Sequence, residues 1–170
     1  PRIDPPVAGL LGADVLAGFD VEIDGPGKRL ALHEPGAGCV PPWPSESVPL
    51  RRTGDRLSVT ARLDGRPVEA LIDTGSLSVV LDIEAALGFG VGRAALARDP
   101  GGISGGVDMR EATYHWHRFA SLAVGPVVTR NPVMTVTGIG EQAPMLLGAS
   151  WFAPRRVWLS FATRRMFIAR

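Results

Sequence analysis

The alternation of apolar and polar residues predicts a succession of short β-strands in the second half of the chain. Apolar side chains alternate with polar ones from Leu57 to Leu63, which is typical of a strand buried on one face. Asp64-Gly65 is a strong hairpin-turn signal, so a second strand is expected at 68–72, ending at Asp73.

Further segments carry the same signals as far as the C-terminus. Strands are expected at 78–82, about 107–117, 119–124, 127–136, 145–148, 157–161 and 165–169, and helical turns at 83–87 and 149–153. The 21 Gly and 15 Pro residues interrupt the chain often, which favours short strands over long helices. The pattern therefore predicts an all-β domain with one or two short helices.

Three parts are expected along the chain. Residues 51–170 are long enough for a complete domain. Residues 33–50 contain several prolines, which exclude a helix and disfavour a β-ladder, so we expect an extended linker. Residues 1–32 hold an apolar Leu10-Leu11-Gly12 and a hairpin pattern around Gly25-Pro26-Gly27-Lys28.

The first part repeats the end of the third at a constant offset of 136 positions. Leu10-Leu11-Gly12-Ala13 matches Leu146-Leu147-Gly148-Ala149 without a gap. The same offset pairs Ala17 with Ala153, Val21 with Val157 and Arg29 with Arg165. We interpret residues 1–32 as the C-terminal remnant of a preceding homologous lobe. Its own counterpart of Asp73 would lie upstream of Pro1.

Composition excludes several other classes of protein. The formal net charge of +1 shows no preference for nucleic acid or membranes, and no apolar run reaches the length of a membrane-spanning helix. Cys39 is the only cysteine, so an internal disulfide is impossible and a catalytic cysteine is not expected. Because the chain begins at Pro1 without a Met, we expect that an upstream segment was removed.

The candidate chemistry lies in Leu71-Ile72-Asp73-Thr74-Gly75-Ser76. The two apolar residues carry the strand into the core, and the Asp73 carboxylate emerges where the strand ends. Gly75 permits a tight turn and a close backbone approach. Thr74 and Ser76 supply hydroxyl groups that can orient a carboxylate.

This motif resembles the active-site loop of the aspartic peptidases of the retropepsin-like and pepsin-like family. The surrounding order also resembles that family: a hairpin comes before, a glycine-rich segment follows, and an apolar-apolar-Gly at 146–148 leads to a short helix and a final hairpin. The resemblance covers about 57–169, and 9–32 through the repeat. It implies a retropepsin-like closed β-barrel lobe of the acid protease type.

The resemblance implies an aspartic endopeptidase with Asp73 as its catalytic aspartate. Thr74 then bonds across the lobe interface, Gly75 takes a backbone role, and Ser76 bonds the outer carboxylate oxygen. A mobile flap that closes over an extended polypeptide substrate is implied for Gly102, Ile103, Ser104, Gly105 and Gly106. We find no match to the flap tyrosine of pepsins and do not assign that role to Tyr114.

The implied mechanism needs two aspartates that share one proton and activate a water molecule. It requires no cofactor and no metal. Asp73 supplies one carboxylate, so the other is expected from a missing first lobe or from a second copy of the chain across a two-fold axis. Family resemblance alone favours an extracytoplasmic location, in the periplasm or secreted.

The sequence offers three alternative interpretations. A catalytically inert lobe could serve dimerisation or peptide binding, because a fold does not imply its function. Gly102 to Gly106 fits Gly-x-Ser-x-Gly, but that motif needs a helix after it, and a strand-like segment follows. His115 and His117 share one strand face but lack the further ligands of a zinc site, so we expect them at the surface.

Overall fold

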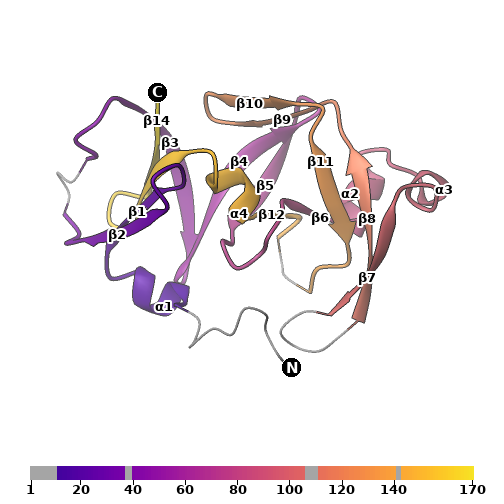
Figure 1. The fold of residues 1–170 in the computed structure, drawn as a ribbon, viewed down its shortest axis with the longest axis horizontal. Helices are drawn as coiled ribbons and strands as arrows, with labels where there is room; N and C mark the ends of the chain where they lie inside the picture. Colours follow the sequence, from indigo (N-terminus) through magenta and orange to yellow (C-terminus); the bar gives the residue numbers. More distant parts are fainter. Residues whose placement is uncertain (1–10, 37–39, 106–110, 141–142) are drawn as a thin grey trace.

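The computed structural model describes residues 11–36, 40–105, 111–140 and 143–170 (Figure 1). The strands are β1 (Asp20–Asp24), β2 (Arg29–His33), β3 (Ser45–Thr53), β4 (Arg56–Leu63), β5 (Arg66–Ile72), β6 (Val80–Asp82), β7 (Gly101–Gly105), β8 (Glu111–Arg118), β9 (Ser121–Val124), β10 (Val127–Arg130), β11 (Val133–Thr137), β12 (Met145–Leu147), β13 (Arg156–Ser160) and β14 (Arg165–Ala169). The helices are α1 (Ala13–Leu16), α2 (Ile83–Gly88), α3 (Arg93–Leu96) and α4 (Ala149–Phe152).

The predicted all-β class with short helices is confirmed. The strands form one bent sheet in the order β2-β1-β13-β14-β3-β4-β5-β12-β6-β11-β8-β7, and the β9–β10 hairpin joins it through β4. The expected closure into a barrel is not observed in the described residues, because this path is open. Its two ends are β2 and β7, and the β7–β8 hairpin lies on the right-hand side of Figure 1, where β8 pairs with β11.

The core lies beneath the central strands. Val59, Ala61 and Leu63 of β4 are fully buried, as their alternation with polar residues predicted. Leu81 and Leu147, from the neighbouring central strands β6 and β12, are equally buried. Parallel pairing of β12 with β5 and of β11 with β6 brings distant segments of the chain together at this point.

The expected linker at 33–50 is partly a strand. β3 pairs with β14 through Ser45 to Pro49 and with β4 through Leu50 to Thr53, so it joins the two terminal hairpins to the central strands. Pro49 is tolerated because its pairing is with β14 alone, and β4 takes over at the next residue. Proline therefore does not prevent strand formation at this position, where β3 pairs with a neighbouring strand on one side only.

Two other elements differ from expectation. The single strand expected at 127–136 is divided into β10 and β11, because Asn131 has a left-handed backbone (φ 49°) and Pro132 follows it. The helix α3 was not expected at all. The Asp64-Gly65 turn is as predicted, with positive φ angles of 49° and 78° that suit a two-residue hairpin.

The 136-residue offset found in the sequence also relates the elements at the two ends of the chain. The bounds of α1, β1 and β2 reproduce those of α4, β13 and β14 at this spacing. Both hairpins turn in the same way: Gly27 N–H donates to Asp24 Oδ1, and Thr163 N–H donates to Ser160 Oγ. Lys28 and Arg164, also counterparts, have φ angles of 50° and 54°. The proposed division of the chain at residues 32 and 50 stays a prediction.

The Glu22 carboxylate joins the N-terminal hairpin to the rest of the chain. Its side chain is 5% exposed, and Arg156 Nε on β13 donates to its Oε1 at 2.7 Å. His33 Nε2 lies 3.1 Å from the other carboxylate oxygen. Burial alone would raise the pKa of Glu22, but the hydrogen bonds from Arg156 and His33 and the charges of Arg156 and Arg29 outweigh it and lower the pKa.

We expect Glu22→Gln to reduce the free energy of unfolding at pH 7 by about 2 kcal/mol, the typical contribution of hydrogen bonds to a charged group. Because its folded-state pKa lies below the ordinary value of 4.5, the carboxylate stabilises the fold above that pH. The contribution disappears as the pH falls through the folded-state pKa. Urea unfolding of both proteins from pH 7 to pH 3 should therefore give curves that converge in acid.

The matched control is Glu84→Gln, because Glu84 forms its ion pair with Arg93 on an exposed surface. This substitution is expected to change the free energy of unfolding by less than about 1 kcal/mol. Parallel pH curves for the wild type and the Glu22 variant would contradict the assignment.

Candidate active site

Asp73 is the first residue after β5, at the point where β5 and β12 lie parallel. Leu147 of β12 is opposite Ile72, and its carbonyl oxygen accepts the Asp73 N–H at 3.2 Å. The backbone of Asp73 is therefore held by Leu147, which is 74 residues away in the sequence. Its side chain is half-buried.

The loop after Asp73 folds back onto its carboxylate. Gly75 N–H donates to Asp73 Oδ1 at 3.1 Å, and Ser76 N–H donates to the Asp73 carbonyl oxygen at 3.1 Å. The Thr74 side chain is exposed. The loop thus presents one oriented carboxylate beside an exposed hydroxyl-bearing residue.

Helix α4 supports the other side of this loop. Its N–H groups at Ala149 and Ser150 donate to the carbonyl oxygens of Ser76 and Leu77, at 2.8 and 3.0 Å. Gly148 makes the approach possible, since a Cβ atom there would lie 1.9 Å from the Ser78 carbonyl oxygen. The apolar-apolar-Gly segment identified in the sequence is thus packed directly against the Asp73 loop.

Ser76 is engaged differently from the role expected of it. Its hydroxyl donates to the Ser78 carbonyl oxygen at 3.1 Å, and no bond to the Asp73 carboxylate is recorded in the described residues. Ser78 in turn shares a 2.8 Å hydrogen bond with Thr135 of β11. A contact between Ser76 and a carboxylate in the assembled site stays a prediction.

The expected flap is a β-hairpin. β7 carries Gly102, Ile103, Ser104 and Gly105 and pairs with β8, while Gly106 lies outside the described residues. The Ile103 side chain is 69% exposed. The contribution of these residues to substrate binding stays a prediction.

Tyr114 belongs to this hairpin, although sequence reasoning left it out. The register places it opposite Gly102, and a Cβ atom on Gly102 would lie 2.9 Å from the Tyr114 hydroxyl oxygen. Trp116 lies beside it, with ring centroids 5.4 Å apart. The glycine at 102 thus makes room for the tyrosine, and the hairpin register is the signal that could have found it.

Neither the zinc site nor the serine-hydrolase motif considered from the sequence is formed in the described residues. His117 Nδ1 lies 2.6 Å from Asp99 Oδ2, both His115 and His117 are half-buried rather than at the surface, and no three potential metal ligands gather in the described ranges. Ser104 lies within β7, and the next described element is β8, so the helix of a nucleophile elbow is not found there. Nor does any described helix have the length and apolar character needed to cross a membrane.

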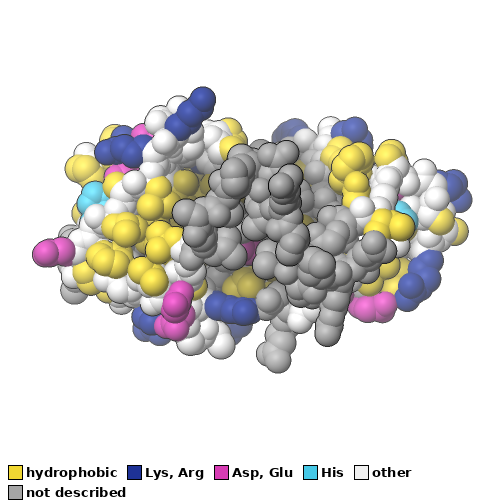
Figure 2. All heavy atoms as spheres, turned by 60° about the horizontal axis from the view of Figure 1, so that its bottom comes forward, with side chains coloured by type: hydrophobic (Ala, Val, Ile, Leu, Met, Phe, Trp, Pro, Cys, Tyr) yellow, Lys and Arg dark blue, Asp and Glu magenta, His cyan; other side chains and the backbone are white. Residues whose placement is uncertain are grey.

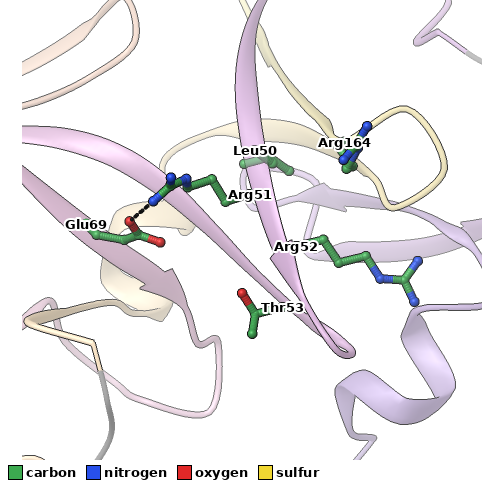
Figure 3. A pocket seen from close by; sticks show the side chains of 6 residues that line it. All are labelled: Leu50, Arg51, Arg52, Thr53, Glu69 and Arg164. Atoms are coloured by element: carbon green, nitrogen blue, oxygen red, sulfur yellow. Dashed lines mark hydrogen bonds and ion pairs between the residues drawn. The ribbon is translucent and has the colours of Figure 1, made fainter.

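A polar cavity of about 480 Å³ lies elsewhere, between β3, β5 and the turn that joins β13 to β14 (Figure 3). It is lined by Leu50, Arg51, Arg52, Thr53, Glu69 and Arg164. Glu69 accepts hydrogen bonds from Ser58 at 2.6 Å and Arg51 at 3.0 Å, and these lower the pKa of its carboxyl group. Arg51 and Glu69 form an ion pair within it, and none of the candidate site residues lines it.

Comparison with known families and structures agrees with this geometry. A family model described as "Aspartyl protease" matches residues 59–151, which include Asp73 and the flap. The match spans more than half of the chain, so the protein belongs to the aspartyl protease family. No curated protein matches it significantly.

Three solved structures are similar to this chain at low identity, and the first of them shows the same fold. A retropepsin-like aspartic protease from Rickettsia conorii aligns with a TM-score of 0.51 and 17% identity, over 76% of this chain and 96% of that one. Basic 7S globulin from soybean aligns over 74% and 42% (TM-score 0.44, 16% identity). The retroviral protease-like domain of Ddi1 from Leishmania major aligns over 55% and 72% (TM-score 0.38, 13% identity).

Proposed function

We propose that this chain is part of an aspartic endopeptidase in which Asp73 provides one of two catalytic carboxylates. The observation that supports this most is the position of Asp73 after β5, where β12 holds its backbone and Gly75 holds its carboxylate. Membership of the aspartyl protease family supports the same conclusion. The second aspartate comes from a first lobe or from a second chain.

The chemistry follows from the sharing of one proton between two adjacent carboxyl groups. The ionised carboxylate takes a proton from a water molecule as the water oxygen adds to the scissile carbonyl carbon. The protonated carboxyl group donates to the carbonyl oxygen and stabilises the developing negative charge. When the C–N bond breaks, the leaving amine receives a proton, and no covalent enzyme intermediate forms.

An extended polypeptide is the substrate that suits the flap. β7 is an end strand of the sheet path and, among the described residues, pairs with β8 alone. Its second edge would then take a peptide added as a further strand. Exposed Ile103, with Tyr114 and Trp116 on β8, would supply apolar contacts to the substrate side chains.

A catalytically inert lobe for dimerisation or peptide binding is the alternative function. It is favoured by the exposure of the Asp73 loop, where Thr74 is exposed and Leu77 is 87% exposed. In that case the loop would contact a partner without any reaction.

The test is hydrolysis of a peptide library by the protein purified from its source in its native assembly. We expect a bell-shaped dependence of rate on pH, because one carboxyl group must be ionised while the other is protonated. A statine-type inhibitor should block the reaction. Peptides that bind and remain uncut at every pH from 3 to 8 would reject the peptidase and support the inert lobe.

A further inference from the structure

The pairing of β1 with β13 has the symmetry of a unit that pairs with its own repeat. Glu22 is opposite Trp158, and these two residues are counterparts at the 136-residue offset. On either side, Asp20 is opposite Ser160 and Asp24 is opposite Arg156. The same offset relates Asp20 to Arg156 and Asp24 to Ser160, so a local two-fold axis passes through the Glu22–Trp158 pair.

This symmetry determines whether a second copy of the chain could pair with β13 at the position that β1 occupies. A copy related by this axis would lay its β13 along the β13 of the first chain in the same register. That edge is already taken, because β13 has β1 on one side and β14 on the other (Figure 1). The α1, β1 and β2 segment therefore holds the position that α4, β13 and β14 of a partner copy would need.

Charge also favours β1 over a second β13. Glu22 of β1 bonds Arg156 of β13 with a side chain that is 5% exposed. A second β13 would place Trp158 at the position of Glu22. Arg156 would then lose its ion pair with the buried Glu22 carboxylate, and the unpaired charge of Arg156 would destabilise the interface.

The N-terminal segment nevertheless lacks the core that its counterpart has. Leu30 and Leu32 are 52% and 39% exposed, whereas their counterparts Met166 and Ile168 are 0% and 2% exposed. In and beside α1, Leu11 and Val15 are 54% and 47% exposed, whereas Leu147 and Trp151 are 0% and 4% exposed. Hydrophobic side chains gather over this end of the molecule in Figure 2. We call Leu11, Val15, Leu30 and Leu32 the hairpin surface.

We infer that the hairpin surface is covered by a lobe of the same fold joined to α1, and that this lobe, not a second copy of the chain, supplies the second aspartate. The inference rests on the proposed function for the role of that aspartate. Its structural part, the position of the lobe, stands on the β1–β13 symmetry and on the four exposed side chains. Exposed hydrophobic side chains that gather on one face of a folded protein mark an interaction site.

A tandem chain tests the inference directly. This protein consists of residues 45–146 followed directly by residues 11–170. Leu146 and Leu10 are counterparts in the repeat, so the junction neither adds nor removes a residue of the repeat. The product carries two Asp73 loops. We expect a monomer that binds less of a hydrophobic dye than the 170-residue chain and cleaves peptides at least about a hundredfold faster, the lower range of acid–base catalysis. Asp73→Asn in either copy should return the rate to that of the 170-residue chain.

The outcomes separate the inference from the proposed function. A monomeric tandem chain with reduced dye binding but no hydrolysis would retain the position of the lobe and reject the peptidase. Unchanged dye binding would overturn the position. If the tandem chain does not fold, the 170-residue chain itself provides the test. An 18.0 kDa monomer that does not hydrolyse peptides would agree with the inference. An active dimer would overturn the inference but retain the proposed peptidase function.

Discussion

Asp73→Asn is expected to reduce peptide hydrolysis by the assembled enzyme at least about a thousandfold, because the site loses the carboxylate that shares the catalytic proton. The fold should not change. Asn has the same shape, and its side-chain oxygen can still accept the Gly75 N–H that now bonds Asp73 Oδ1 at 3.1 Å. The measurements are kcat/KM for a cleaved peptide and the midpoint of thermal unfolding.

Asp55→Asn is the matched control for this substitution. Asp55 is an exposed carboxylate whose recorded partner is Arg52, and it lies outside the candidate site. It should retain the wild-type rate. If the Asp73 variant also retained full activity, Asp73 would have no catalytic role, whereas loss of activity together with unfolding would indicate a structural role.

Gly148→Ala is expected to destabilise the chain by about 3 kcal/mol, at the upper end of the cost of overpacking a core. The new Cβ atom would lie 1.9 Å from the Ser78 carbonyl oxygen and 2.8 Å from that of Ser76. Both obstacles are backbone atoms, so no side-chain rotation relieves the clash. For a chain of this length the loss corresponds to a fall of about 10 °C in the unfolding midpoint.

The backbone angle at Gly148 is not the cause of this effect. Its φ of −85° is available to any residue, so the need for glycine arises from the close approach of two backbone segments. Gly138→Ala is the control, because a Cβ atom there would have no atom within 4 Å, and it should change stability by less than about 0.5 kcal/mol. Equal effects of the two substitutions would refute the packing of β12 and α4 against the Asp73 loop.

Both predictions depend on contacts between segments that are distant in the sequence. Asp73 is held by Leu147, and the loop that follows it is held by Gly148 and α4. A substitution at Gly148 should therefore lower activity as well as stability, since it displaces the loop that orients the carboxylate. Activity per folded molecule separates this displacement from simple unfolding.

Local signals in the sequence were sufficient for much of the fold. The alternation in β4, the Asp64-Gly65 turn and the closing hairpin each depend on neighbouring residues, and each has the predicted form. The Asp-Thr-Gly-Ser motif marked the catalytic candidate because its residue types suit one strand end and one tight turn. The family match then confirmed the resemblance to the aspartyl proteases, whereas the catalytic role of Asp73 stays a prediction.

The predictions that were wrong concern residues whose role depends on pairing partners. Pro49 was expected in a linker, but it lies in β3, which pairs with β14 near the C-terminus of the chain. No flap role was assigned to Tyr114 and none has been tested, but the β7–β8 register places it opposite Gly102, which its sequence position did not suggest. The closed barrel was inferred from resemblance, whereas the strand path of this chain has two open ends.

The sequence by itself determined the strand periodicity, the turns, the aspartate motif and the 136-residue repeat, because each depends on residue types at short or constant spacing. Only the tertiary structure decided which strand supports Asp73, why Gly148 must be glycine, and that β1 already covers the edge of β13. The physical reason is that strand pairing and close backbone approach depend on the position of a partner segment, and a one-dimensional pattern does not specify that position.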